Sequence, residues 1–217
     1  IDLAFMAKPA QPEKHSREYL DQFTFYANNF DAMAKSANLK LLEGEDPSGG
    51  TILSSTSLNS FKTVYGTQPF PRGTRNYFEI RFLHGCNFKI GVSLTNTLVE
   101  NAFATQVTVM VFIPQAASEA EQDAGPQVRI SFRGTKDNDV IGVYVDTVEG
   151  RIFFSKNGRV YETAFEGPEL QADLYPACAC LTKEESFELL YPQPEIERYC
   201  YYNLLKPSYY GVLGFWG

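Results

Sequence analysis

The sequence contains few of the side chains from which metal sites and active sites are usually built. Its 217 residues include two histidines, four cysteines and one tryptophan. A metal centre or an acid–base pair needs His, Cys, Asp or Glu at convergent spacings. No His-x-His, Cys-x-x-Cys or nucleophile-elbow pattern occurs. We therefore expect no catalytic residues, no metal site and no cofactor, and we predict that the chain is not an enzyme.

Clusters of positive charge and long apolar runs are also lacking. The 19 Lys and Arg residues are scattered among 26 Asp and Glu, for a formal net charge of −7. Nucleic-acid affinity comes largely from clustered cations that displace counterions, so we expect no direct nucleic-acid partner. No run approaches the roughly 20 apolar residues that cross a bilayer. The first residue is Ile1, so we expect a piece of a longer protein. The residues that follow it include no basic leader and no long apolar stretch, so we expect that protein to be intracellular (cytoplasmic) and not associated with a membrane.

The cysteines do not form the pattern of a disulfide framework. Cys178 and Cys180 are two residues apart in an apolar, strand-like run, so both should point to the same face of a strand and are poorly placed to bond each other. The other two cysteines are Cys86 and Cys200. We expect reduced, mostly buried thiols, as is usual in intracellular proteins.

Aromatic residues and period-two patterns are abundant. Phe and Tyr number 17 and 13, and hydrophobic residues make up 44% of the chain. Residues 76–83 alternate, with Phe78, Ile80 and Phe82 on one side, as a half-buried antiparallel strand requires. We expect residues 88–94 to pair with this strand across the short turn at 84–87. Many short strands at near-even spacing indicate an all-β antiparallel sandwich. The further predicted strands are 39–43, 61–65, 106–113, 128–132, 139–146, 152–156, 176–181 and 186–191.

The N-terminal region has a different period. Leu20, Phe23, Ala27, Phe30 and Ala34 recur at spacings of three and four, which predicts a helix over residues 16–36. Its aromatic stripe would either cover one edge of the sandwich or dock an outside partner. The chain thus divides into an N-terminal extension (1–38), the sandwich (39–191) and a Tyr- and Pro-rich C-terminal extension (192–217).

Residues 139–158 are the most informative stretch. Two β-rich runs flank a polar turn, and the second run ends in Asn157-Gly158, a dipeptide that favours tight turns with positive φ. Asp139 and Asp146 bracket the first run, and we expect them to cap turns by side-chain hydrogen bonds to the backbone.

This stretch, together with other segments in the same order, resembles the SPRY (B30.2-type) domain family. The matching segments are Gly73 to Ile80, Ile90-Gly91-Val92, the hairpin at 139–158, and Leu174-Tyr175-Pro176. The resemblance covers roughly residues 39–191. It implies a concanavalin-like, jelly-roll β-sandwich that binds other proteins and has no active site.

The resemblance also implies where a partner binds, namely loops at one end of the sandwich. The corresponding loops are residues 84–87, 95–103, 133–139 and 181–185. His84 and Asn87 would offer hydrogen bonds, Gly85 would let a partner's backbone approach, and Lys183 could pair with a partner carboxylate. The predicted contact residues are His84, Gly85, Cys86, Asn87, Leu98, Arg133, Leu181, Thr182 and Lys183.

The sequence is compatible with two other functions. The chain could be a structural sandwich domain built permanently into a large intracellular assembly through its helix and tail. Glycan binding is a weaker third possibility, because lectins share the double-sheet architecture. We favour a module that recruits a protein or peptide partner and is monomeric as an isolated domain.

Overall fold

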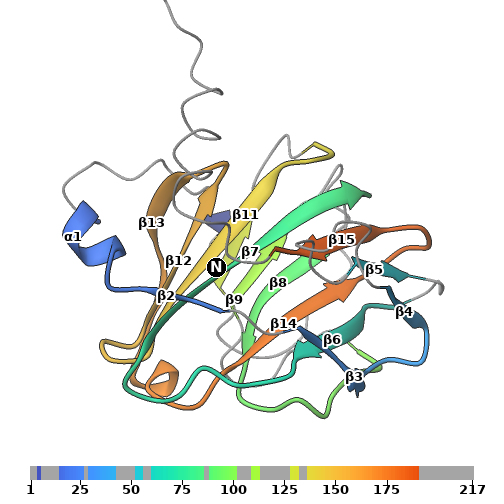
Figure 1. Cartoon of the computed structure of the whole chain (residues 1–217), viewed down its shortest axis with the longest axis horizontal. Coiled ribbons are helices and arrows are strands. Elements are labelled where there is room, and N and C mark those ends of the chain that lie inside the picture. Colours follow the sequence, from blue (N-terminus) through green and yellow to red (C-terminus); the bar gives the residue numbers. More distant parts are fainter. Residues whose placement is uncertain are drawn as a thin grey trace, which may run out of the picture.

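The computed structural model describes residues 4–5, 15–26, 29–42, 52–55, 60–85, 88–101, 109–112, 128–131 and 136–190. Strands dominate these residues (Figure 1). The elements in chain order are β1 (Ala4–Phe5), α1 (Arg17–Leu20), β2 (Thr24–Phe25), β3 (Phe30–Lys35), β4 (Leu39–Leu42), β5 (Ile52–Ser55), β6 (Lys62–Gly66), β7 (Arg75–His84), β8 (Phe88–Ser93), β9 (Val109–Phe112), β10 (Val128–Ser131), β11 (Val140–Asp146), β12 (Arg151–Lys156), β13 (Arg159–Glu166), a 3-10 turn η1 (Pro168–Leu170), β14 (Tyr175–Cys180) and β15 (Ser186–Leu189).

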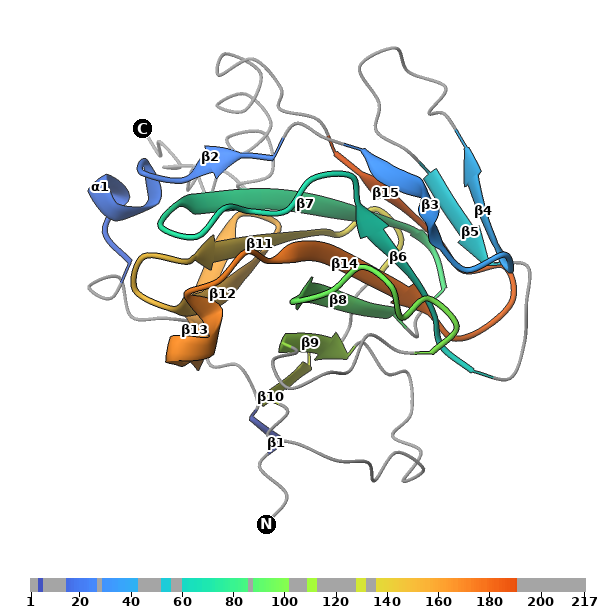
Figure 2. The same cartoon turned by 90° about the horizontal axis from the view of Figure 1, so that it is seen from below.

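Two sheets pack face to face, as Figure 2 shows from below. The 8-stranded sheet has the order β13-β12-β11-β7-β15-β5-β4, with β2 pairing beside β7. The 4-stranded sheet has the order β3-β6-β14-β8. Pairing within both sheets is antiparallel except between β2 and β7. A third, small parallel sheet, β1-β10-β9, is not hydrogen-bonded to these two within the described residues, although β9 lies beside β8 (Figure 2). The predicted antiparallel sandwich is confirmed.

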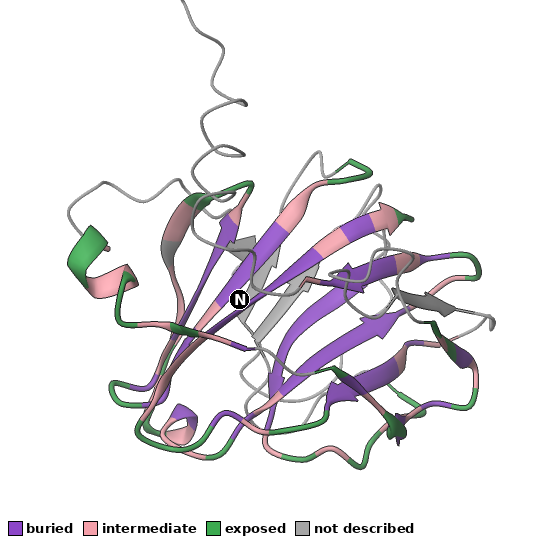
Figure 3. Cartoon of the chain, in the orientation of Figure 1, coloured by how far each residue is buried: buried purple, intermediate pink, exposed green. Residues whose placement is uncertain are grey.

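The core lies between the two sheets. Phe78, Ile80 and Phe82 of β7 belong to one buried cluster with Ile90 of β8 and Cys178 of β14, so the predicted inward face of residues 76–83 is confirmed. Burying each large apolar side chain contributes about 1.5–3 kcal/mol. Figure 3 shows the buried residues concentrated along the strands of both sheets, whereas α1 has no buried residue.

The hairpins around residues 139–158 form as the sequence predicts. β11 and β12 pair antiparallel from Ile141↔Lys156 to Asp146↔Arg151. Asn157 (φ 49°) and Gly158 (φ 76°) form the next turn, between β12 and β13. Both have the positive φ that a two-residue hairpin turn of this type needs, and Asn and Gly adopt it at the least cost.

The N-terminal helix is much shorter than predicted. Its single turn starts at Ser16, whose Oγ accepts a hydrogen bond from the backbone N–H of Tyr19 at 3.2 Å. The prediction of a helix over 16–36 is wrong beyond this turn, because β2 and β3 follow and contribute to both sheets. The segment after α1 is rich in Phe, Tyr, Thr, Asn and Asp, which are weak helix formers. Phe30 also enters the core, where its ring lies 5.7 Å from that of Phe187.

The predicted hairpin between β7 and β8 is also wrong. β7 pairs with β11 on one edge and with β15 on the other, whereas β8 pairs with β14 in the opposite sheet. With both edges of β7 occupied, no edge is left for β8. The chain instead crosses between the layers, and the rings of Phe82 and Phe88 pack 4.8 Å apart in the core.

Candidate functional site

Several connections meet at the end of the sandwich where β7 and β14 finish, on the right in Figure 1. His84, the last residue of β7, pairs with Ser186, the first residue of β15. Residues 181–185, which join β14 to β15, therefore lie beside His84. The backbone N–H of Asn138 donates to the carbonyl of Phe82 at 2.7 Å, so residues 136–138 join the same group. We call these three described segments (84–85, 136–138 and 181–185) the loop end.

Glu185 organises the connection between β14 and β15. Its side chain is buried, and its carboxylate accepts hydrogen bonds from the backbone N–H groups of Leu181 and Thr182, each at 2.8 Å. The adjacent Cys180 thiol is buried, and this burial raises its pKa well above the usual value, with a further contribution from the negative charge of Glu185. The loop thus has a fixed shape before any partner arrives, which lowers the ordering cost of binding.

Gly85 is required by packing within the loop end. Its φ of +102° is rarely adopted by residues with a side chain, and an added Cβ would lie 2.5 Å from Cγ of Glu185 and 3.1 Å from its Cα. The side of Gly85 that lacks a side chain is therefore occupied by Glu185. Gly85 is nevertheless exposed, so the approach of a partner's backbone from its open side stays a prediction.

Asp139 shapes residues 136–138. Its carboxylate accepts hydrogen bonds from the backbone N–H of Lys136 and from Asn157 Nδ2, both at 2.8 Å, and lies 2.9 Å from Lys156 Nζ. Burial opposes ionisation of Asp139, but the hydrogen bonds and the Lys156 ammonium outweigh it, so that its pKa is lowered. The prediction that Asp139 caps a turn is confirmed.

The exposed groups of the loop end carry both signs of charge. His84 Nδ1 lies 3.9 Å from Asp137 Oδ2, and Lys183 Nζ lies 3.7 Å from Glu184 Oε1. These four side chains are all more than half exposed, from 58% for Lys183 to 73% for Glu184. Such pairs contribute little to stability. They are accessible donors and acceptors that can exchange their present neighbours for groups on another molecule.

Leu98 lies away from the other predicted contacts. Its carbonyl accepts a hydrogen bond from Tyr65 Oη at 2.9 Å, and Tyr65 pairs with Ala177 within β14. The neighbouring Val99 carbonyl accepts from the backbone N–H of Thr63 at 2.9 Å. Residues 98–99 thus run over the outer face of the 4-stranded sheet, where the Leu98 side chain is 44% exposed.

The structure brings together part of the predicted contact set. His84, Gly85, Leu181, Thr182 and Lys183 share the loop end, whereas Leu98 lies on the sheet face. The remaining predicted contacts, Cys86, Asn87 and Arg133, lie outside the described residues.

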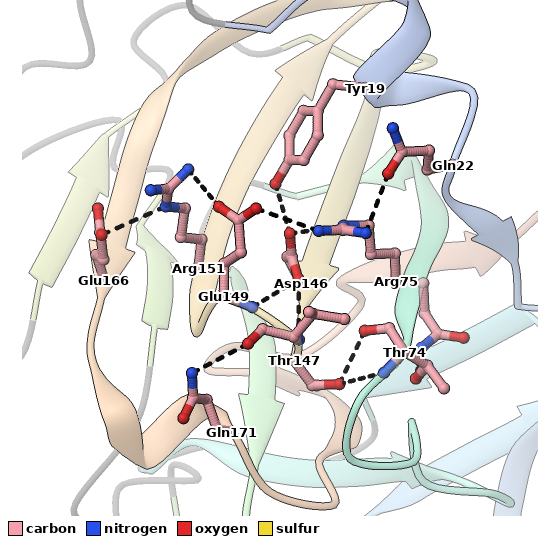
Figure 4. Close-up of polar contacts among 12 residues, drawn as sticks. Tyr19, Gln22, Thr74, Arg75, Asp146, Thr147, Glu149, Arg151, Glu166 and Gln171 are labelled. Atoms are coloured by element: carbon pink, nitrogen blue, oxygen red, sulfur yellow. Dashed lines mark hydrogen bonds and ion pairs between the residues drawn. The ribbon is translucent and has the colours of Figure 1, made fainter.

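A second polar cluster, at the opposite end of the sandwich, has little signal in the sequence (Figure 4). Asp146 is fully buried, and its Oδ2 accepts from Tyr19 Oη at 2.6 Å and from Arg75 Nε at 2.8 Å. Its Oδ1 accepts from the backbone N–H groups of Val148 and Glu149, which confirms the predicted turn cap. Burial opposes ionisation of Asp146, but these hydrogen bonds and the Arg75 charge lower its pKa overall. Tyr19 and Arg75 stand 127 and 71 residues away in the chain, so local patterns could not reveal the cluster.

Within the part of the chain that the structure describes, no helix is long and apolar enough to span a membrane. Over the same residues, no group of three or more His, Cys, Asp or Glu side chains is arranged to hold a metal ion.

Two packed antiparallel sheets with structured connections at their ends define a β-sandwich scaffold. The sequence matches the family model described as the SPRY domain over residues 75–194, more than half of the chain. The chain belongs to the SPRY domain family, whose members are protein-interaction modules and are generally not enzymes.

Solved structures support the same fold. The SPRY domain of human HERC1 is 17% identical, with a TM-score of 0.53 over 76% of this chain and 99% of that chain. The PSpry domain of TRIM65 is 13% identical, with a TM-score of 0.50 over 85% of this chain and 99% of that chain. Stonustoxin is 17% identical, with a TM-score of 0.50 over 84% of this chain and 30% of that chain. No curated protein matches the sequence significantly.

Proposed function

We propose that this domain is a non-enzymatic module that recruits a protein or peptide partner through the loop end. The main support is the buried Glu185 carboxylate, which fixes residues 181–182 beside His84. In this arrangement the side chains of Lys183 and Glu184 are exposed. A rigid sheet that presents pre-ordered loops is a physically favourable binding device.

The exposed groups suggest a polar partner surface. His84, Lys136 and Lys183 offer donors, and Asp137 and Glu184 offer acceptors. A partner segment with charged residues of both signs would complement them, with Lys183 facing a carboxylate. Such complementarity mainly determines specificity and association rate.

The alternative, a domain fixed permanently in a large assembly, depended in part on a long aromatic helix free to dock elsewhere. The helix has one turn, and the aromatic residues around it contact the domain's own sheet. This favours the loop-end proposal.

Charge reversal at each end of the sandwich tests the proposal. Lys183→Glu changes the loop end, and Arg72→Glu is the matched control, because Arg72 is exposed beside the Thr74–Thr147 contact at the opposite end. Proteins captured from cell extract should be lost or reduced at least tenfold with Lys183→Glu and retained with Arg72→Glu. Unchanged capture by a folded Lys183→Glu, Lys136→Glu double variant would show that the loop end is not the binding surface.

A further inference from the structure

A row of aromatic rings crosses three adjacent strands on the outer face of the 8-stranded sheet. Tyr77 of β7, Tyr144 of β11 and Phe153 of β12 stack in sequence, with ring centroids 4.2 Å and 4.6 Å apart. Their chain neighbours Phe78 and Val143 point into the core, so these three rings point the other way. We call this row the aromatic face.

Residues 15–26, which we call the strap, cover the aromatic face. The His15 ring stacks on Phe153 at 4.1 Å, and Phe23 meets Tyr144 edge-on at 5.3 Å. Phe25 meets Tyr77 edge-on at 5.5 Å. Each contact joins a ring of the strap to a ring of the sheet.

The strap is weakly built in itself. Its helix α1 has a single turn and no buried residue, and its strand β2 has two residues. Helices this short are unstable alone, and segments with few backbone hydrogen bonds to the rest of a protein open at lower free energy than the core. The second half of the strap is anchored to β7 by the pairing of β2 and by the Tyr26 N–H, which donates to the Tyr77 carbonyl at 2.7 Å. The backbone hydrogen bonds of residues 16–23 are local to the strap, so this first half depends on its side-chain contacts with the sheet.

Two polar contacts fix the strap's first half (Figure 4). Tyr19 Oη donates to Asp146 Oδ2 at 2.6 Å, and Arg75 donates to Gln22 Oε1 at 3.0 Å. Asp146 and Glu149 both lie close to Arg75. A negative charge introduced at Tyr19 would face the Asp146 carboxylate and remove the donated hydrogen bond.

We propose that the aromatic face is a second protein-binding surface, which the strap occupies in cis. The strap itself defines the ligand chemistry. His15, Tyr19 and Phe23 place rings at every fourth position, and the Tyr19 hydroxyl reaches Asp146. The partner segment has aromatic side chains at this spacing and a hydroxyl donor in the middle. It must compete with a tethered segment, whose effective concentration is on the order of millimolar.

Hydrogen–deuterium exchange on the full chain tests whether the strap opens independently. Tyr19→Glu should raise exchange in residues 15–23 at least tenfold while the strands of both sheets keep their protection. Thr24→Glu is the control, since it adds the same charge at an exposed strap position that no hydrogen bond joins to Asp146. Tyr19→Phe, which keeps the ring, should give a smaller increase. If strap and sheets exchange together in every variant, the strap is part of the core and the proposal is wrong.

A labelled peptide with the sequence of residues 15–26 tests binding in trans. By fluorescence anisotropy it should bind the full-length Tyr19→Glu protein saturably, and wild type at least tenfold more weakly. Adding Tyr144→Ala to Tyr19→Glu should abolish the binding. No saturable binding to a protein whose strap is open, or binding that Tyr144→Ala leaves unchanged, would overturn the proposal.

Discussion

Glu184 and Glu185 are neighbours in the chain but have opposite environments. Glu184 is 73% exposed and has a positive φ of 72°, whereas Glu185 is 1% exposed and accepts two backbone hydrogen bonds. Glu184 is therefore available to a partner, whereas Glu185 fixes the shape of the loop that carries Glu184.

Replacing these two glutamates should therefore have very different effects. Glu185→Ala leaves the N–H groups of Leu181 and Thr182 without their acceptor, and each such loss costs about 1–3 kcal/mol when the group is buried. We expect a loss of about 2 kcal/mol or more in the free energy of unfolding, measured in urea. Glu184→Ala should change it by less than about 0.5 kcal/mol. Equal effects of the two substitutions would contradict the assigned role of Glu185.

Gly85→Ala should destabilise the domain through both backbone strain and steric overlap with Glu185. Gly73→Ala is a matched control, because Gly73 also has a positive φ (78°) but no atom lies within 4 Å of an added Cβ. The positive φ alone costs about 1–2 kcal/mol. Chemical denaturation should show Gly85→Ala to be the more destabilised by about 1–3 kcal/mol, the usual cost of overpacking. Equal losses would mean that Glu185 moves aside without cost.

The sequence predicts the exposed loop that contains Glu184 and Glu185, but it does not predict which of the two glutamates is buried. The four polar residues at 182–185 predicted an exposed loop, and three of them are at least partly exposed. The sequence around Glu185 does not distinguish it from Glu184, because the burial of Glu185 also depends on its packing against Gly85, a hundred positions away in the chain. The loop end was predictable as a location, but the residue that organises it was not.

The same contrast applies to the fold. The hairpins around 139–158 were predictable because alternation and Asn157-Gly158 act locally. The spacing of Phe23 and Phe30 predicted a helix, although the two residues lie on different sides of the sheet, Phe23 against Tyr144 and Phe30 in the core. A helical spacing therefore arose from a chain that passes from one side of a sheet to the other. Tertiary packing decided the outcome over local periodicity.

The thiols of Cys178 and Cys180 should be unreactive in the folded protein. Both are fully buried, and burial raises the pKa of each thiol well above its usual value. Because the thiolate is the reactive form, iodoacetamide at pH 8 should leave the peptide that contains them unmodified. Mass spectrometry after labelling in denaturant should show modification at both. Labelling of the native protein at a comparable rate would show that β14 opens readily.

The pH dependence of stability should report on Asp146. The pKa of Asp146 is lower in the folded than in the unfolded state. As the pH falls towards the unfolded pKa of about 3.9 and below it, the unfolded chain therefore takes up this proton before the folded protein does. The stabilising contribution of Asp146 is therefore complete above that pH and is lost as the pH falls through its folded pKa. Asp139 has a lowered pKa of the same origin and adds to the loss.

Asp146→Asn should separate this contribution from the rest. Asparagine can still cap the Val148–Glu149 turn but cannot pair with Arg75, and removing one partner of a buried ion pair typically costs about 3–5 kcal/mol. The control is Asp21→Asn, whose carboxylate lies 4.0 Å from Arg17 in a highly exposed pair and should contribute at most about 1 kcal/mol. Urea unfolding between pH 7 and pH 3 should show a lower stability for Asp146→Asn at pH 7 and a shallower fall at acidic pH. A variant that matches wild type at both ends of this range would mean that the Tyr19–Asp146–Arg75 cluster does not stabilise the domain.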